Sequence, residues 1–243
     1  MHLLQVTAAG HSQTGKRPQN EDAFHIDLPQ GVFVVADGMG GLLAGEEASR
    51  LATLEIPKII QQRVLEKDPP QEAVAIALEV ANQKIIQQAH SDPAMQGMGT
   101  TAVVAFVVPN RVYVGNLGDS PAFLIRDGGC TRLTHDHTVT DELVRKGLLT
   151  PEQAKTHPWR NRLFKYLGCV EMQELAEIHE FPPKKGDRLI LVSDGVANFI
   201  AHADYVATLA AHAQPQAAAE VLTNLALARG SQDNVTCLVV ALD

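Results

Sequence analysis

The chain has 243 residues, a length that suits one large domain better than two small ones, because a single core can serve up to about 250–300 residues. Hydrophobic residues make up 45% and charged residues 20%, which excludes a disordered chain. The net charge of −8 argues against a protein whose main partner is nucleic acid, since phosphate binding requires a basic face. We therefore expect one domain over residues 1–243.

The cysteines and the apolar runs indicate the compartment. Cys130, Cys169 and Cys237 show no short metal-binding spacing, and an odd number is a poor basis for disulfides, so free thiols are expected. The longest apolar run, residues 102–108, is far shorter than the ~20 residues of a membrane helix. The first ten residues lack the pattern of a secretory signal. These features predict a cytoplasmic protein without a membrane partner, and we expect a monomer.

Apolar patterns in the first half of the chain predict strands around two long helices. A strand at 3–8 and a polar loop at 11–20 precede two strands, 23–28 and 32–36, joined by the turn Pro29-Gln30-Gly31. Helical spacing predicts helices at 46–64 and 71–89, the first kinked or broken at Pro57. Hairpin turns then separate four further strands: 100–108, 112–116, 122–126 and 130–133.

The second half predicts a mixed segment followed by strands and a second helix pair. Residues from about 141 to 168 are expected to form short helical pieces. The elements predicted after them are strands at 176–180 and 188–193, helices at 203–213 and 216–228, and a strand at 235–241. This order lacks the regular strand–helix alternation of a doubly wound fold. We expect an α+β fold in which two antiparallel sheets form a sandwich with a helix pair outside each.

Acidic residues fall where apolar strands end. The residues concerned are Glu21, Asp22, Asp37, Asp119, Asp194 and Asp233. One Asp-Gly pair after a strand is ordinary turn chemistry, but a series of such positions is harder to explain in that way. Converging carboxylates repel one another unless a cation neutralises them. Oxygen donors without Cys or His select Mg²⁺ or Mn²⁺, so the pattern predicts a two-metal hydrolase site.

Six short motifs follow one another along the chain: RPQNED (17–22), VADGMGG (35–41), GTT (99–101), GDS (118–120), SDG (193–195) and DNVT (233–236). This series resembles the bacterial form of the metal-dependent serine/threonine protein phosphatases of type 2C (the PPM family). The resemblance implies a four-layer αββα sandwich with a small flap subdomain at about residues 140–170. It also implies hydrolysis of phosphoserine and phosphothreonine in phosphorylated protein partners, by direct attack of a metal-activated water at a binuclear Mn²⁺ or Mg²⁺ centre.

The resemblance further implies a role for four residues at that centre. Asp37 is expected to bridge the two metal ions. The carbonyl of Gly38 is expected to bind one ion, while Asp194 and Asp233 bind the other. These assignments come from matching the motifs position by position.

Four more matched residues surround this set. Glu21 and Asp22 are expected to support the centre directly or through water. Asp119 matches the ligand of a third, weaker metal, shared with Asp194. Arg17 matches the arginine that holds the substrate phosphate, for which the bidentate guanidinium fork is well suited.

Two positions depart from the family pattern. Leu42 stands where many bacterial relatives have a histidine, and a histidine near this site is a proposed general acid. A side chain that cannot donate a proton predicts poorer hydrolysis of phosphoserine peptides than of activated aryl phosphates, because serine is the worse leaving group. Pro121 replaces the arginine of the family's GDSR motif, which puts local phosphate or flap contacts in doubt more than metal binding.

Three other patterns have ordinary explanations. Residues 10–17 nearly spell a phosphate-binding P-loop, but Arg17 replaces the Ser or Thr that holds Mg²⁺. His135 and His137 resemble the start of a metallohydrolase motif, yet no further cluster follows, so a structural role in the loop before the flap is favoured. Trp159 is expected to pack within the flap, with a substrate contact as the alternative.

Two functional alternatives remain open at this point. A catalytically weak relative that binds phosphoproteins is motivated by Leu42 and Pro121. The intact set of Asp37, Asp194 and Asp233 argues against it, because a binding module needs no carboxylate cage. A phosphatase of small phosphoesters is the other alternative, since residues alone do not reveal the depth of the site.

Overall fold

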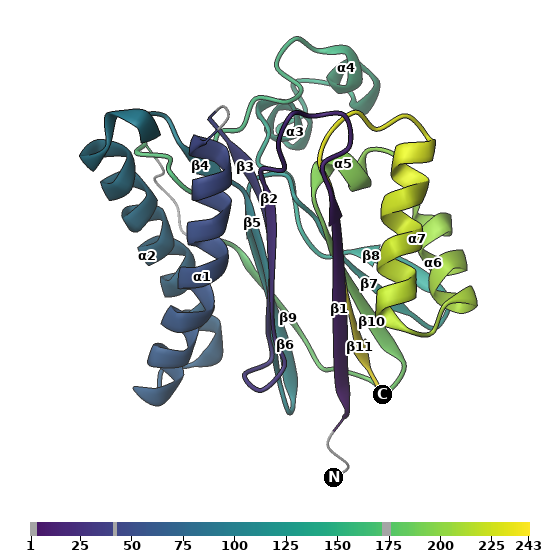
Figure 1. Cartoon of the computed structure of the whole chain (residues 1–243). Coiled ribbons are helices and arrows are strands. Elements are labelled where there is room, and N and C mark those ends of the chain that lie inside the picture. Colours follow the sequence, from purple (N-terminus) through teal and green to yellow (C-terminus); the bar gives the residue numbers. More distant parts are fainter. Residues whose placement is uncertain (1–3, 41–42, 172–175) are drawn as a thin grey trace.

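The computed structural model describes residues 4–40, 43–171 and 176–243. Its strands form two antiparallel sheets packed face to face, and helices cover the outer face of each sheet (Figure 1). The layers follow the order helix, sheet, sheet, helix. The expected α+β sandwich of four layers is therefore confirmed.

The first sheet brings the two ends of the chain together. Its strand order is β1 (Val6–Gln13), β11 (Val235–Leu242), β10 (Asp187–Val192), β7 (Ala122–Arg126) and β8 (Gly129–Arg132). In the β1–β11 pair, Gln13 lies opposite Val235. The loop after β1 and the residues just before β11 are thus neighbours, although more than 200 positions separate them in the sequence.

The second sheet carries the acidic hairpin. Its strand order is β2 (Asp22–Asp27), β3 (Val32–Met39), β5 (Ala102–Val108), β6 (Arg111–Leu117) and β9 (Ile178–Phe181), and β4 (Gly99–Thr100) pairs with the end of β3. The register of the β2–β3 hairpin sets Asp22 directly opposite Asp37. Two carboxylates predicted from separate motifs are therefore cross-strand partners.

The continuous apolar run of β3 is explained by burial on both faces. Val32 and Val34 pack against α1 (Ala44–Leu65) and α2 (Pro70–Ser91), outside the second sheet. The alternate residues, Phe33 and Val35, point into the core between the two sheets. Outside the first sheet, the matching cover is α6 (His202–Ala211) and α7 (Pro215–Ala228).

The predicted site residues gather at one end of the sandwich. Here β6 and β10 end and β11 begins, so Asp119, Asp194 and Asp233 come together from three strands. Figure 1 shows the short helices α3 (Val139–Arg145), α4 (Pro151–Thr156) and α5 (Asp194–Ala197) at this same end. The expected flap segment therefore lies beside the strand ends that carry the carboxylates.

Several local predictions are wrong. Strand β1 continues to Gln13 through residues expected to form a loop, because polar side chains find partners there: His11 Nδ1 lies 2.7 Å from Thr223 Oγ1. Helix α1 runs unbroken through Pro57, whose ring is buried in the packed face of the helix. Residues 157–168 form turns and isolated bridges instead of helix. The short helix α5 and a 3₁₀ turn, η1 (Pro93–Met95), were not expected.

In the described part of the chain, no helix is both long enough and apolar enough to cross a bilayer.

Candidate active site

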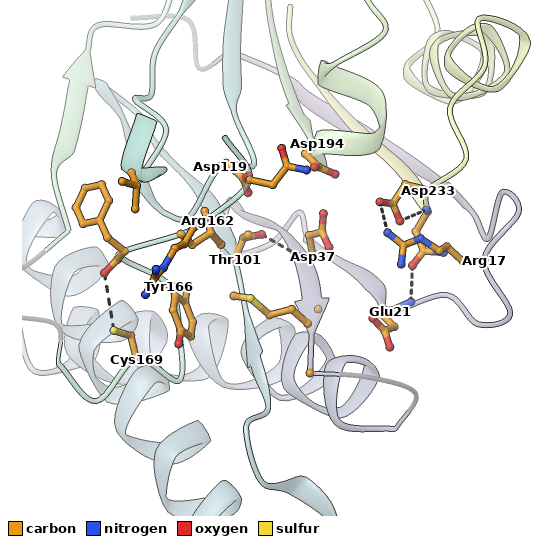
Figure 2. A pocket seen from close by; sticks show the side chains of 18 of the residues that line it. Arg17, Glu21, Asp37, Thr101, Asp119, Arg162, Tyr166, Cys169, Asp194 and Asp233 are labelled. Carbon is orange, nitrogen blue, oxygen red and sulfur yellow. Dashed lines mark hydrogen bonds and ion pairs between the residues drawn. The ribbon is translucent and has the colours of Figure 1, made fainter. Parts of the chain in front are cut away.

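One cavity of about 1110 Å³ opens at this end of the sandwich. Its lining includes Arg17 and five carboxylates, which we call the carboxylate floor: Glu21, Asp37, Asp119, Asp194 and Asp233. Figure 2 shows these side chains arranged around a common space, with Asp37 between Asp119 and Asp233. The sixth predicted carboxylate, Asp22, is buried beside Asp37 and does not line the cavity. The structure thus brings the predicted residues together.

Asp37 is held through its main chain by two threonines. The Thr101 hydroxyl accepts a hydrogen bond from the Asp37 N–H (3.0 Å), and the Thr101 N–H donates to the Asp37 carbonyl (2.8 Å). The Thr100 hydroxyl donates to the same carbonyl (2.9 Å). Thr101 Oγ1 also lies 2.6 Å from Ser120 Oγ. The GTT motif therefore holds the main chain of Asp37, and the GDS motif contacts it through Ser120. Their sequences alone did not indicate this role.

Asp22 is almost completely buried and only half satisfied. Its Oδ2 accepts hydrogen bonds from Ser193 Oγ (2.8 Å) and Thr236 Oγ1 (2.6 Å). Its Oδ1 is buried without a hydrogen-bond partner. Burial raises the pKa of Asp22 to about 7, against the smaller opposite effect of the two hydroxyl donors. A buried carboxylate oxygen without a partner is costly, so a cation or water is its natural complement.

Burial and mutual repulsion shift the other carboxylates in the same direction. The pKa of Asp119 is raised to about 7, first by burial and then by the charge of Asp194. Burial, followed by repulsion from Asp22 and Asp194, holds the pKa of Asp37 well above its ordinary value. For Asp194, burial again raises the pKa, with Asp233 as the next cause. Such repulsion is what bound cations relieve.

Arg17 is positioned by the DNVT motif. Its guanidinium donates to Asp233 Oδ2 at 2.7 Å, and this ion pair raises the pKa of Arg17. The side chain of Asn234 holds the loop that carries Arg17, because its amide donates to the carbonyls of Thr14 (2.8 Å) and Gln19 (2.9 Å). Its Oδ1 accepts from the Glu21 N–H at 2.9 Å. Asn234 belongs to the DNVT motif, but no local pattern indicates that it holds this loop.

Gly38 lies where no side chain fits. A Cβ at this position would come within 2.1 Å of the Gly45 carbonyl oxygen and 2.6 Å of the Glu21 carbonyl oxygen. A Cβ on Gly45 would in turn meet the Glu21 carboxyl carbon at 2.8 Å. The start of α1 therefore packs closely against β3, with Glu21 beside the contact, and this explains why the motif requires glycine.

The donor set suits divalent cations, although it does not form a closed cage. Among the residues that the structure describes, no three His, Cys, Asp or Glu side chains converge enough to form a ready-made metal site. Instead the carboxylates surround the cavity, and one of them, Asp233, is paired with Arg17. All the donors are oxygen atoms, most belong to buried or half-buried residues, and their negative charges lack a matching number of cationic partners. This is the chemistry that Mg²⁺ and Mn²⁺ select.

The opposite side of the cavity is formed by the flap segment. We call this lining the flap wall: Val139, Trp159, Asn161, Arg162, Leu163, Phe164, Tyr166, Cys169 and Glu171. Arg162 and Tyr166 lie across the cavity from Arg17 in Figure 2. The guanidinium of Arg162 lies over the Trp159 ring, 5.8 Å from its centroid. Of these residues, only Trp159 was named from the sequence as an alternative substrate contact.

Two weak sequence patterns turn out to be structural. Residues 10–17 lie in β1 and the turn after it, and the next element is β2, so the helix that a P-loop needs is missing there. His137 is buried and its Nδ1 accepts a hydrogen bond from the Gly118 N–H (3.1 Å). Pro121 is also buried, and its carbonyl accepts from the Val192 N–H (3.1 Å). Leu42 lies outside the described residues.

Comparisons with known proteins agree with this geometry. The family model described as protein phosphatase 2C matches residues 9–228. The serine/threonine phosphatase stp of Listeria innocua is 32% identical over 229 residues, which cover 92% of this chain and 90% of that protein. The crystal structure of the serine/threonine phosphatase PstP from Mycobacterium tuberculosis gives a TM-score of 0.86 at 31% identity, over 99% of this chain and 100% of that one.

A second PstP structure bears on the metal question. It shows the catalytic domain of that phosphatase in complex with two manganese ions, and it matches at a TM-score of 0.83 and 30% identity, over 98% of this chain and 99% of that one. The matches extend over nearly the whole chain, as the six motifs had indicated. This chain belongs to the protein phosphatase 2C family.

Proposed function

We propose that this protein is a metal-dependent phosphatase that hydrolyses phosphoserine and phosphothreonine in proteins. The observation that carries the proposal is the gathering of Arg17 and the five carboxylates of the carboxylate floor around one cavity. Carboxylates provide ligands for divalent cations, and an arginine provides a fork for a phosphate group. The family and the names of its matched members support the same reaction.

In this proposal two Mn²⁺ or Mg²⁺ ions belong to each chain. Asp37 bridges them, the Gly38 carbonyl contributes to one ion, and Asp194 and Asp233 contribute to the other. The matched PstP structure with two manganese ions supports this number. When bound, such ions lower the pKa of a coordinated water and neutralise charge on phosphoryl oxygens.

Three further carboxylates complete the proposed set. Glu21 and Asp22 support the centre directly or through water, and the unpartnered Oδ1 of Asp22 favours such a contact. Asp119 serves a third, weaker metal site together with Asp194. After burial, the charge of Asp194 is the next cause of the raised pKa of Asp119, which supports their being used together.

The phosphate is held by Arg17. Its ion pair with Asp233 is exposed, with 56% of the Arg17 side chain and 37% of the Asp233 side chain accessible. Exposed ion pairs are worth little, so the guanidinium can exchange this carboxylate for a phosphate at small cost. Two parallel N–H donors then orient the phosphoryl group and stabilise its developing charge. Asn234 keeps the loop of Arg17 in place during this exchange.

Leaving-group protonation is the weak point of the proposed reaction. Leu42 occupies the position of a family histidine and cannot donate a proton. Loss of a positioned acid costs about 10²–10⁴-fold for a poor leaving group. We therefore expect activated aryl phosphates to be hydrolysed relatively better than phosphoserine peptides, and equal efficiency on both classes contradicts this part of the proposal.

The names of the matched relatives favour a protein substrate over a small metabolite. They include a serine/threonine phosphatase of Listeria innocua and a protein phosphatase of Streptococcus pneumoniae. Residues 1–243 act as one phosphatase domain, and the flap at about 140–170 contacts the segment around the phosphorylated residue. We expect a cytoplasmic monomer that works on phosphoproteins and not on nucleic acid, since the net charge is −8.

The test is hydrolysis of p-nitrophenyl phosphate in Mn²⁺, in Mg²⁺ and in EDTA, for the wild type and for Asp37→Asn. Activity that requires metal and falls by at least about 10³-fold in the variant supports the proposal. Asp27→Asn is the matched control, because Asp27 lies at the far end of the same hairpin and its Oδ1 only accepts from Gln30 N–H (3.0 Å).

The same assay decides between the alternatives. Folded, metal-loaded protein that shows no turnover identifies a phosphoprotein-binding relative. Turnover of small phosphoesters without any turnover of phosphopeptides identifies a small-molecule phosphatase. Either result overturns the proposed function.

A further inference from the structure

The turn that carries Asp119 is packed against Thr101 and leaves no room for a side chain at Gly118. Gly118 adopts a positive φ of 108°, and a Cβ on it would come within 2.5 Å of Thr101 Cγ2. The residue therefore has no side chain with which to fix the turn, and its peptide groups must be held by hydrogen bonds. Asn116 supplies a weak one, donating to the Gly118 carbonyl at 3.4 Å.

His137 supplies two shorter hydrogen bonds, one to the N–H and one to the carbonyl of Gly118. Its imidazole Nδ1 accepts from the Gly118 N–H at 3.1 Å. Its own main-chain N–H donates to the Gly118 carbonyl at 3.0 Å. The side chain is only 4% exposed, so water does not compete for the acceptor. Because Nδ1 accepts a hydrogen bond from an amide N–H, the imidazole is the neutral tautomer with its proton on Nε2.

The same histidine is also bonded to the flap wall. Its carbonyl accepts from the Phe164 N–H at 2.9 Å, and the two rings meet edge to face with centroids 5.8 Å apart. An isolated bridge between Thr138 and Leu163 continues this contact. Leu163 and Phe164 line the cavity that Asp119 also lines. His137 thus contacts both Gly118, next to Asp119 of the carboxylate floor, and Phe164 of the flap wall.

We propose that His137 is a positioning residue, which clamps the Gly118–Asp119 turn and joins it to the flap through Phe164, so that the two move as one unit. The inference rests on the proposed phosphatase function, since it says how the flap is coupled to a carboxylate of that site. A substrate that shifts the flap also shifts Asp119. Loss of the clamp leaves both the carboxylate and the wall less ordered.

The protonation state required by the clamp is supported by its surroundings. Burial lowers the pKa of His137 to about 4, and the positive charges of Lys165 and Arg145 act in the same direction. Glu142 alone acts oppositely. The imidazole therefore stays neutral, with Nδ1 free to accept, throughout the neutral range.

Two substitutions separate the acceptor from the ring. In His137→Asn the Oδ1 atom stands as many bonds from the backbone as Nδ1 does, so the acceptor is kept while the ring is lost. In His137→Phe the ring against Phe164 is kept and the acceptor is lost. We expect kcat to fall about tenfold in His137→Phe, with a much smaller change in His137→Asn.

Recovery of kcat in His137→Asn is the readout that a merely structural role would not give, and amide hydrogen exchange shows where the loss of the acceptor acts. With ¹⁵N-labelled protein, the Gly118 and Phe164 amides are expected to exchange faster together in His137→Phe and to stay protected in His137→Asn. His179→Phe is the control for the substitution itself, because His179 is an exposed histidine that also lies against a phenylalanine, Phe181. It should change neither kcat nor these two amides.

Opposite results overturn the proposal. Equal activity in the two His137 variants, or a Gly118 amide that does not respond to loss of the acceptor, shows that the clamp plays no part. If His137→Phe does not fold, the imidazole ¹⁵N shifts of the wild type decide, since a proton on Nδ1 is incompatible with the bond from Gly118. An inactive wild type overturns the proposed function instead, while the exchange and tautomer measurements still test the clamp.

Discussion

The cavity has two sides whose side chains are held in different ways. On the carboxylate floor, Asp37 has its main chain bonded by Thr100 and Thr101, directly after five buried residues of β3. On the flap wall, Trp159 is 51% exposed, and its ring contacts are those with His157 at 5.6 Å and Arg162 at 5.8 Å. The floor is fixed by the sheets, whereas the wall is built from short helices and turns.

This difference separates chemistry from recognition. Groups that act on every substrate need a fixed geometry, and strand ends within a packed sandwich provide it. A surface that adapts to different protein segments needs few internal contacts, as the loops around a rigid scaffold have. Substitutions on the floor should therefore impair all substrates alike, and those on the wall should discriminate between them.

Substitution of Arg17, which lies beside the carboxylate floor, is expected to have the largest effect on activity among these tests. Arg17→Ala should lower kcat/KM by about 10–100-fold for both p-nitrophenyl phosphate and a phosphopeptide, because a charge-assisted hydrogen bond to phosphate is worth ~1.5–3 kcal/mol. Arg17→Lys should recover only part of it, since lysine lacks the planar fork. Arg50→Ala is the control, because Arg50 pairs with Glu47 on the surface of α1. A loss of activity confined to the phosphopeptide would show that Arg17 recognises the peptide and does not bind the phosphate of every substrate.

Asn234 tests whether the floor depends on its hydrogen bonds for stability. Asn234→Ala leaves the carbonyls of Thr14 and Gln19 and the N–H of Glu21 without their partner. We expect the free energy of unfolding to fall by about 2 kcal/mol, measured by urea denaturation. Asn224→Ala, which removes an exposed acceptor for Gln13, should change it by less than ~0.5 kcal/mol. Equal effects of the two substitutions would show that the Arg17 loop does not depend on Asn234.

His137 lies where the carboxylate floor and the flap wall meet, and its titration makes the free energy of unfolding depend on pH. Its folded-state pKa is about 4, below the ordinary value of 6.5, so the unfolded chain binds the proton more readily. The stability due to the neutral imidazole is complete above about pH 6.5 and is lost as the pH falls toward 4. Between pH 7.5 and pH 5, the wild type should lose about 2 kcal/mol relative to His137→Asn, in EDTA.

The comparison with the variant is needed because other groups titrate in the opposite sense. The pKa values of Asp22 and Asp119 are raised to about 7, so these carboxyls favour the folded state on acidification. Their contribution is common to the wild type and His137→Asn and cancels in the difference. Parallel stability curves for the two proteins would show that the imidazole is not buried in its neutral form.

The floor could be predicted from the sequence much better than the wall. Asp37, Asp194 and Asp233 stand next to apolar runs, and the ends of buried strands converge in a sandwich, so local patterns were enough to find them. The hairpin of residues 23–28 and 32–36 was predicted from its short turn, and the structure adds the register that sets Asp22 opposite Asp37. These features depend on neighbours in the sequence or on a simple rule of sheet packing.

Long-range side-chain bonds could not be predicted. Asn234 binds residues more than 200 positions earlier in the chain, and His137 binds Gly118 across the start of the flap, and no periodicity encodes either contact. The prediction that the first helix breaks at Pro57 failed for a different reason. The ring of this proline is buried in the packed face of α1, so tertiary packing outweighs the missing hydrogen bond, which a local propensity rule ignores.

Trp159 gives the smallest expected effect and tests the wall itself. Trp159→Ala should lower kcat/KM for phosphopeptides by about 3–10-fold, since contacts of an aromatic ring are worth ~0.5–1.5 kcal/mol beyond their buried area. Turnover of p-nitrophenyl phosphate should stay within about twofold, because the phosphate is bound by the floor and a small ester need not reach the ring. The control is Leu148→Ala, another exposed apolar residue of the flap segment that does not line the cavity. If both substrates lose activity equally in Trp159→Ala, the wall contributes to the geometry of the floor, and the separation of recognition from chemistry fails at this residue.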